Sequence, residues 1–271
     1  MRSALRHSPH ALTLVELLVV VAIIALLMAI LLPSLGLARA ASKLAVCGSN
    51  LRQLGAAVHA YATENSGYIP RGPQPAHPFD FSGNGIATNQ LWIGVGGWGG
   101  KPANPRQYQG LGALLPTVCP DPRTYFCPAD DNFEWRESLP RIGTDQDAYG
   151  SYLYRQLDHL PRSRNEGLLD ALGANVVADQ PVPVEALAFD ANSLGPGPLW
   201  HTSHEARVAN VLYRDGSVRH YANRANCLAL PASVFEQPSN LLRALDQLLT
   251  NADYSYRTGA PHEAPRLRDV P

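Results

Sequence analysis

The pattern of apolar and polar positions is most distinctive near the start of the chain. Residues 12–32 form an apolar segment of 21 residues in which only Thr13 and Glu16 are polar. A helix of this length covers about 30 Å, the thickness of the hydrocarbon layer of a bilayer, and it is longer than the apolar core of a cleavable secretory signal. The segment therefore predicts a helix that spans a membrane.

The residues before this segment predict its orientation. Residues 1–11 carry Arg2, Arg6 and the terminal amine, and they contain no acid. Basic residues that flank a membrane helix stay on the cytoplasmic side. We therefore expect the N-terminus in the cytoplasm and the rest of the chain on the far side of the membrane.

The apolar pattern changes after Pro33 but remains helical. Residues 34–64 contain no proline, and Asn65-Ser66-Gly67 supplies a stop signal. Apolar residues recur at spacings of three and four, at Leu44, Cys47, Leu51, Leu54, Val58 and Tyr61. This spacing marks one face of a helix, so the stripe is expected to dock on a folded domain. A continuous helix would be about 80 Å long.

From Tyr68 onward, short apolar and aromatic runs alternate with glycine and proline, as at residues 91–100 and 151–157. This texture favours an irregular β-rich domain. The clearest element is a hairpin over residues 207–222, in which Asp215-Gly216 suits a type I′ turn. An amphipathic helix is expected at residues 239–250, and the tail after Asn251 reads as unstructured.

These elements predict an α+β fold, in which one long N-terminal helix packs on an irregular antiparallel β-rich domain. The helix crosses the membrane with its first half. The expected organisation is a cytoplasmic leader at 1–11, the N-terminal helix at 12–65 with its transmembrane part at 12–32, the β-rich domain at 66–232, and a C-terminal helix with a disordered tail at 233–271.

Charge narrows the choice of partners. The chain has 22 Lys and Arg against 23 Asp and Glu, so it lacks the basic excess of a nucleic-acid binder, and no nucleic acid is expected as a partner. Glu16 is unusual, because a carboxylate costs about 2.5–3.5 kcal/mol at the centre of a membrane helix and less near its edge. Either its side chain reaches the lipid headgroups or it pairs with a cation.

The sequence Ala11-Leu12-Thr13-Leu14-Val15-Glu16 with its apolar run resembles the type III signal of type IV pilins and type II secretion pseudopilins. The resemblance implies that a prepilin peptidase cuts between Ala11 and Leu12 and methylates the new terminus at Leu12. It also implies that Glu16 pairs with the terminal amine of a neighbouring subunit during assembly. Pro33 stands where pilins commonly carry a helix-kinking proline. Ala11 departs from the glycine that is usual in the family.

A second resemblance covers more of the chain. A large bacterial group of pseudopilin-like proteins, named for a prepilin-type signal and an H-x9-DG motif, looks similar at residues 47–55, 110–112, 126–130, 151–152 and 204–216. Here ten residues separate His204 from Asp215. This resemblance supports the protein class and indicates no substrate.

Together the resemblances imply a structural subunit of a type II secretion pseudopilus or type IV pilus-like filament in the bacterial inner membrane, with its domain periplasmic or extracellular. The implied partners are prepilin peptidase, other pilin-like subunits, the inner-membrane assembly machinery and the lipid bilayer. Two alternatives remain. One is a membrane-anchored binding domain that does not polymerise. The other is a secreted protein cut after residues 38–40, which resemble a signal-peptidase site.

No catalytic residues are predicted, because the chain lacks G-x-S-x-G, P-loop and H-E-x-x-H motifs. We expect no enzymatic activity. Four residues near the hairpin are of metal-binding types, namely His201, His204, Asp215 and His220. Their spacing fixes no third ligand, so no metal site is predicted.

Calcium remains a candidate cofactor, and no other is expected. Major pseudopilins hold calcium in a loop, and residues 130–132 and 190–192 carry suitable oxygen ligands. A disulfide is allowed outside the cytoplasm. Cys127 is the favoured half of one, with Cys119 or Cys47 as its partner.

Overall fold

The computed structural model forms two compact units, residues 1–42 and 43–271. The structure describes residues 14–70, 87–94, 106–131, 135–155, 169, 174–177, 180–190, 193–194, 200–223, 226–233 and 238–259.

The first unit contains the beginning of helix α1 (Leu14–Glu64), which continues through Pro33 as the sequence predicts. Residues 14–37, here called the exposed segment, leave their large apolar side chains exposed on every face of the helix. Proline cannot donate a backbone hydrogen bond. In the residue after Pro33, the Ser34 hydroxyl donates to the carbonyl of Leu31 at 2.9 Å. By length and composition, α1 can cross a membrane.

The second unit is built on a six-stranded antiparallel sheet in the order β10-β9-β6-β3-β1-β2. Its strands are β1 (Ala87–Ile93), β2 (Gln107–Tyr108), β3 (Ala148–Arg155), β6 (Ala186–Asp190), β9 (Val208–Tyr213) and β10 (Val218–Ala222). Two small antiparallel pairs are formed by β4 (Ala174–Val177) with β5 (Gln180–Pro183) and by β7 (Ser193–Leu194) with β8 (Trp200–His201). The remaining elements are η1 (Gly110–Leu114), η2 (Pro122–Tyr125), α2 (Trp135–Ser138), η3 (Leu139–Arg141), η5 (His204–Ala206) and α3 (Pro238–Thr258).

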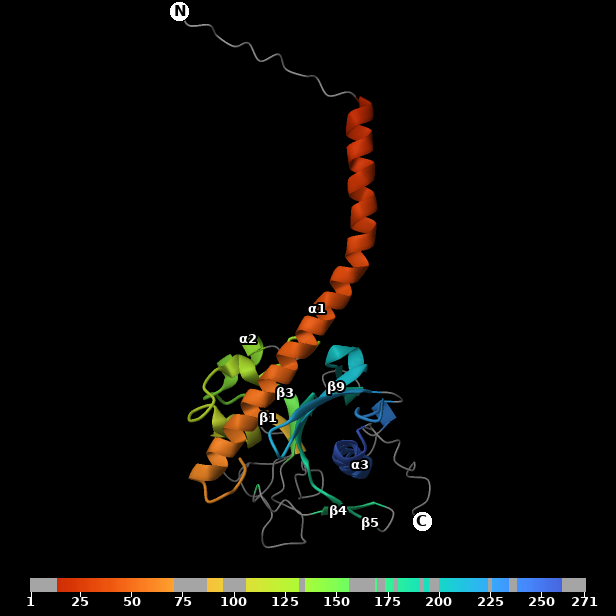
Figure 1. Ribbon diagram of the computed structural model, residues 1–271. Helices are drawn as coiled ribbons and strands as arrows, with labels where there is room; N and C mark the ends of the chain where they lie inside the picture. Colours follow the sequence, from red (N-terminus) through yellow and green to blue (C-terminus); the bar gives the residue numbers. More distant parts are fainter. Residues whose placement is uncertain are drawn as a thin grey trace, which may run out of the picture. The chain divides into compact units, whose positions relative to one another are not determined.

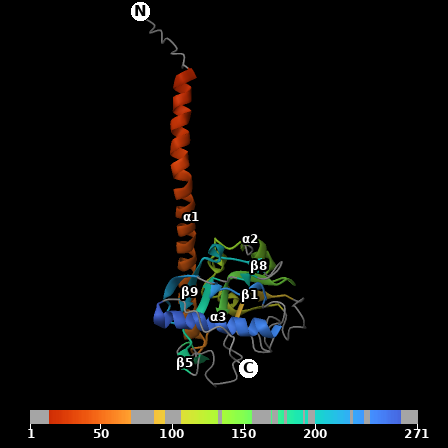
Figure 2. The same cartoon turned by 90° about the vertical axis from the view of Figure 1, so that its right-hand side faces the viewer.

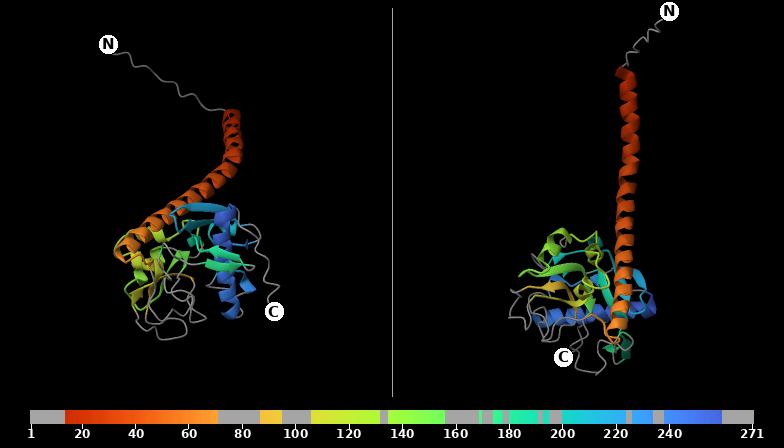
Figure 3. Two further views of the ribbon diagram at one scale, coloured as in Figure 1. Left: turned by 60° about the horizontal axis from the view of Figure 1, so that its bottom comes forward. Right: turned by 90° about the vertical axis from the view of Figure 1, so that its left-hand side faces the viewer.

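The sheet has a core on each face. Residues 43–64 of α1, here called the docking segment, cover one face, and α3 covers the other (Figures 1 and 3). The alternation along β9 shows this division, because Leu212 packs with the docking segment while Val211 and Tyr213 pack with α3. Figure 2 shows α3 running across the strands. The predicted α+β, pilin-like layout is confirmed.

The predicted stop of α1 is also confirmed. Ser66 and Gly67 both adopt positive φ, and the amide of Gly67 donates to the carbonyl of Ala62 at 2.7 Å. This geometry satisfies a carbonyl of the last helical turn.

The hairpin is present, but its predicted type I′ turn is wrong. A type I′ turn needs positive φ at both Asp215 and Gly216, and only Gly216 has it, at 80°. Tyr213 accepts from the amide of Gly216 and donates its own amide to Ser217, both at 2.9 Å. These bonds close a three-residue loop with a glycine bulge, which accommodates Arg214 as well.

The predicted unstructured tail after Asn251 is wrong for residues 252–258, which continue helix α3. Three polar residues at this end of the helix, Asn251, Asp253 and Ser255, are buried with partners. Asp253 forms a bidentate ion pair with Arg155 of β3, with both distances 2.9 Å, and Asn251 donates to the carbonyl of Cys227. Because these polar groups are satisfied inside the domain, the helix can extend past the leucine stripe. The end of the expected tail lies outside the described residues.

Candidate functional site

Two features of the structure carry chemistry, and the first is the exposed segment of α1. Glu16 lies in its first helical turn, where a negative charge is favoured by the helix dipole. Pro33 lies inside the same helix. The predicted cleavage residues Ala11 and Leu12 lie outside the described residues.

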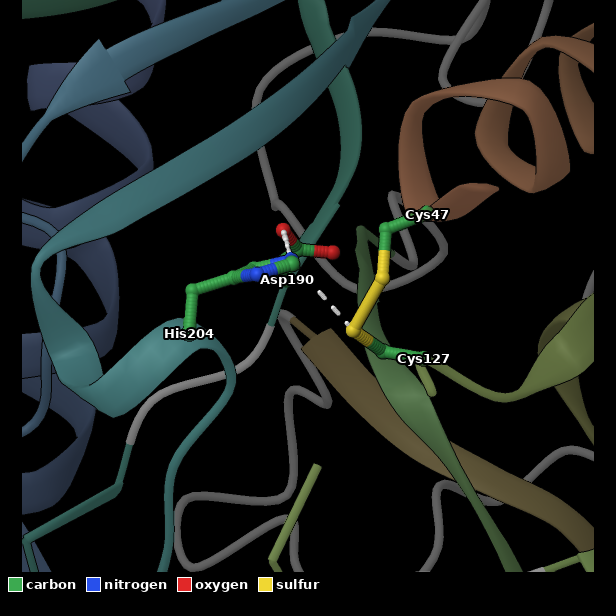
Figure 4. Close-up of side chains that lie close together, drawn as sticks. All are labelled: Cys47, Cys127, Asp190 and His204. Atoms are coloured by element: carbon green, nitrogen blue, oxygen red, sulfur yellow. Dashed lines mark hydrogen bonds and ion pairs between the residues drawn. A yellow bond between two sulfur atoms is a disulfide. The ribbon is translucent and has the colours of Figure 1, made fainter. Parts of the chain in front are cut away.

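The second feature is a cluster of four side chains (Figure 4). Cys47 comes from the docking segment, Cys127 from the loop after η2, Asp190 from the end of β6, and His204 from η5. One ligand atom of each lies within 4.8 Å of the ligand atoms of all the others. We call these four residues the Cys/His/Asp cluster.

Within the cluster, Cys47 and Cys127 form a disulfide, with their Cα atoms 5.2 Å apart. Of the two candidate partners of Cys127, Cys47 is therefore correct and Cys119 is wrong. The side-chain amide of Asn50 donates to the carbonyl of Phe126 at 3.0 Å, which fastens the Cys127 loop to α1. Cys119 remains a buried thiol, and its burial raises the pKa of that thiol.

The other two members of the cluster, His204 and Asp190, are held in place by hydrogen bonds to residues of the sheet. Nε2 of His204 lies 3.3 Å from Oδ2 of Asp190 and 3.4 Å from Sγ of Cys127. The same Asp190 oxygen accepts from the backbone and side-chain amides of Asn210, at 3.0 and 2.6 Å. Nδ1 of His220 lies 3.2 Å from the side-chain oxygen of Asn210. These contacts fix the orientation of the carboxylate.

One hydrogen bond and one unusual backbone conformation place His204 next to the Cys127 loop. Thr202 donates from its hydroxyl to Asp131 at 2.8 Å, which joins the segment before His204 to the loop. His204, Glu205 and Ala206 then all adopt positive φ, between 53° and 55°. This conformation costs about 1–2 kcal/mol per residue for side chains other than glycine. The strained residues form the turn η5, which directs the imidazole of His204 into the domain.

The cluster combines some residues that the sequence singled out and leaves others elsewhere. His204 and His220 are linked through Asp190 and Asn210. By contrast, His201 lies on β8 and pairs with Ser193, and Asp215 lies at the hairpin turn, where it accepts from Tyr256.

The two candidate calcium loops are partly used by the fold. Asp131 is occupied by Thr202, and Asp190 belongs to the Cys/His/Asp cluster. Asn132 and Asn192, the amide ligands of those loops, lie outside the described residues.

The sequence does not predict the cluster as a whole. Its disulfide joins positions 80 residues apart, and Asp190 and His204 come from two further elements. A partial signal was available. The helical stripe placed Cys47 on the buried face of α1, where a second cysteine would be expected to meet it.

Comparison with known families identifies the first feature. Residues 6–32 match the model of the prokaryotic N-terminal methylation motif, which is the prepilin signal of type IV pilins and pseudopilins. No curated protein and no solved structure matches the chain. The match covers a small part of the chain, and it supports a type IV pilin-like precursor that is processed by prepilin peptidase.

Proposed function

We propose that this chain is a structural subunit of a filament of the type II secretion pseudopilus or type IV pilus kind. The observation that carries the proposal is the methylation motif at residues 6–32 on a helix that is apolar on every face. Prepilin peptidase cuts between Ala11 and Leu12 and methylates the amine of Leu12. The role is structural, and no catalytic residue is assigned.

The exposed segment requires apolar surroundings, because a helix that is apolar all round is stable in a membrane or a protein core and not in water. The bilayer supplies these surroundings before assembly, and the same segment of neighbouring subunits supplies them afterwards. A single stretch of α1 therefore serves as the membrane anchor and as the packing surface of the filament.

Glu16 sets the axial register between subunits. After cleavage it is the fifth residue of the mature chain, and its carboxylate pairs with the terminal amine of a neighbour. An unpaired charge inside the filament is strongly unfavourable, so only the register that matches carboxylate to amine is stable.

The proposed orientation has the N-terminus in the cytoplasm and the second unit outside the inner membrane. Arg2 and Arg6 before the apolar segment support it. The Cys47–Cys127 disulfide supports it independently, because structural disulfides persist mainly in oxidising compartments.

The first test is the mass of the N-terminal peptide of the membrane-extracted protein, produced together with a prepilin peptidase. We expect a peptide that begins at Leu12 and carries one additional methyl group. A peptide that begins at Met1 would instead support an anchored domain that is never processed. A start near Ala41 would mean that the helix is a secretion signal.

The second test compares Glu16→Gln with Glu64→Gln, a matched change in the last residue of the same helix. We expect Glu16→Gln to insert normally and to disappear from the sheared filament fraction, while Glu64→Gln assembles like wild type. Normal assembly of Glu16→Gln would contradict the proposed pairing.

A further inference from the structure

The Cys/His/Asp cluster has the donor atoms of a zinc site. Zinc in proteins is bound tetrahedrally by cysteine thiolates, histidine nitrogens and carboxylate oxygens, at about 2.3, 2.0–2.1 and 2.0–2.2 Å. Those bond lengths give a tetrahedron whose edges are about 3.6 Å from sulfur to nitrogen and about 3.4 Å from nitrogen to oxygen. The observed separations from Nε2 of His204 are 3.4 Å to Cys127 and 3.3 Å to Asp190. Two edges of such a tetrahedron are therefore already present.

Of the other four edges, three join ligand atoms that lie within 4.8 Å of each other, and the fourth joins the two sulfur atoms. In a zinc site they stand about 3.8 Å apart, whereas here they are bonded to each other. The Cα atoms of Cys47 and Cys127 are 5.2 Å apart, so rotation about the two Cα–Cβ bonds can supply that separation once the disulfide is open.

Burial and unsatisfied polarity give an independent reason to expect a cation. The side chain of Asp190 is fully buried, and the side chain of His204 is 7% exposed. Among the described residues, Oδ1 of Asp190 has no hydrogen-bond partner. A buried carboxylate oxygen without a partner is costly. Figure 4 shows the imidazole and the carboxylate facing the two cysteines.

The surroundings of the carboxylate resemble the outer shell of a metal site. Ligating carboxylates are usually oriented by hydrogen bonds from neighbouring residues. Asn210 supplies two such bonds to Asp190, and His220 orients the amide of Asn210 in turn. The sheet thus fixes the carboxylate before any ion is bound.

We propose that Cys47, Cys127, His204 and Asp190 bind one zinc ion when the disulfide is reduced. The disulfide and the zinc ion are then alternative links between the docking segment and the sheet domain. This proposal does not depend on filament assembly.

The interconversion is a two-electron exchange with a dithiol or a phosphine. A dithiol gives its two electrons and two protons to the S–S bond and becomes a disulfide. A phosphine gives two electrons and becomes a phosphine oxide, with water supplying the oxygen atom and the two protons. Either route leaves two protein thiols. Zinc then replaces the two thiol protons, which are released to solvent. In the reverse direction a disulfide oxidant takes two electrons from the thiolates, the S–S bond forms again, and the zinc ion leaves.

The test uses the full-length chain in detergent, reduced with a phosphine, loaded with zinc chloride and dialysed without oxygen. We expect about one zinc per reduced chain and essentially none in the oxidised chain. In His204→Ala and Asp190→Ala, zinc affinity should fall by more than the about 10- to 100-fold that is typical of outer-shell changes. Cys119→Ser is the matched control, because Cys119 is also a buried cysteine, and it should bind zinc like wild type.

Cobalt(II) gives a second readout, because its visible spectrum distinguishes tetrahedral thiolate coordination from loose surface binding. We expect that spectrum in reduced wild type and in reduced Cys119→Ser, and its loss in Cys47→Ser. The proposal is overturned if reduced wild type retains no metal, if oxidised protein retains as much, or if His204→Ala and Asp190→Ala give the wild-type spectrum.

Discussion

The exposed segment and the docking segment belong to the same helix and differ in where their apolar residues lie. Residues 14–37 are apolar on every face, and their side chains are exposed. In residues 43–64 the apolar side chains form one stripe, of which Cys47, Leu51, Leu54 and Val58 are completely buried. The distribution of apolar residues, more than their number, therefore indicates whether a helix packs on its own domain or needs lipid or other chains.

The largest expected difference between the segments comes from the same change made in each. Leu51→Ala removes a buried side chain from the core against the sheet and should lower the free energy of unfolding of the domain by about 2–5 kcal/mol. Leu27→Ala, at an exposed position, should change it by less than about 0.5 kcal/mol. Urea unfolding followed by tryptophan fluorescence measures this, since all four tryptophans lie after residue 90. Equal changes in unfolding free energy for Leu51→Ala and Leu27→Ala would show that the two segments do not differ in packing.

An added charge should be tolerated in the docking segment and not in the exposed segment. Ile23→Arg places a cation near the middle of the exposed segment and should disfavour membrane insertion by about 2.5–3.5 kcal/mol. Ala60→Arg, on the solvent side of the docking segment, should insert like wild type. The fraction of protein that resists alkaline extraction from membranes measures insertion. Retention of Ile23→Arg at the wild-type level would argue against a membrane-spanning segment.

Two glycines provide a finer comparison. A Cβ at Gly55 would lie 2.7 Å from a methyl carbon of Leu212, whereas a Cβ at Gly36 would meet nothing within 4 Å. Crowding costs about 1–3 kcal/mol, and better helix propensity returns up to about 1 kcal/mol. Gly55→Ala should therefore destabilise the domain by about 1 kcal/mol, and Gly36→Ala should leave its urea midpoint unchanged. A stabilising Gly55→Ala would show that Leu212 is not tightly packed.

The smallest effect concerns the hairpin turn, which the docking segment meets where Nε2 of His59 lies 2.9 Å from the carbonyl of Arg214. Partial burial of Asp215 opposes its ionisation, but hydrogen bonds from Ser217 and Tyr256 outweigh this and lower its pKa below 3.8. A lowered pKa means that the carboxylate stabilises the folded state above about pH 4, and that this stabilisation is lost as the pH falls through the folded pKa.

Asp215→Asn should therefore remove a small part of the acid sensitivity of the domain. Urea midpoints between pH 3 and pH 7 measure it, with Tyr256→Phe expected to give a weaker version of the same change. Identical pH profiles for Asp215→Asn and wild type would rule out this contribution.

Local patterns were sufficient to predict much of the fold. The spacing of apolar residues predicts α1 and its buried stripe, and Asn65-Ser66-Gly67 predicts its end. These features depend on neighbouring residues along the chain. The turn at Asp215 was predicted in position but not in type, because the pairing of Tyr213 with Ser217 sets the loop length.

Long-range pairing accounts for what the sequence did not predict. The ion pair of Asp253 with Arg155 cannot be predicted from the residues next to Asp253 in the chain. The end of α3 was therefore predicted to be an unstructured tail. The Cys/His/Asp cluster has the same origin, because β6 brings Asp190 to residues that the chain supplies much earlier and slightly later. Sheet order decides such contacts, and sheet order is not a local property.

The position of the Cys47–Cys127 bond has a mechanical consequence. Tension applied along α1 enters the second unit at Lys43, and Cys47 lies only one helical turn further along. There a covalent bond transfers the load to the loop beside the sheet, before the apolar contacts of Leu51 and Leu54 are strained. While that bond is intact, pulling cannot peel the docking segment away from the Cys127 loop.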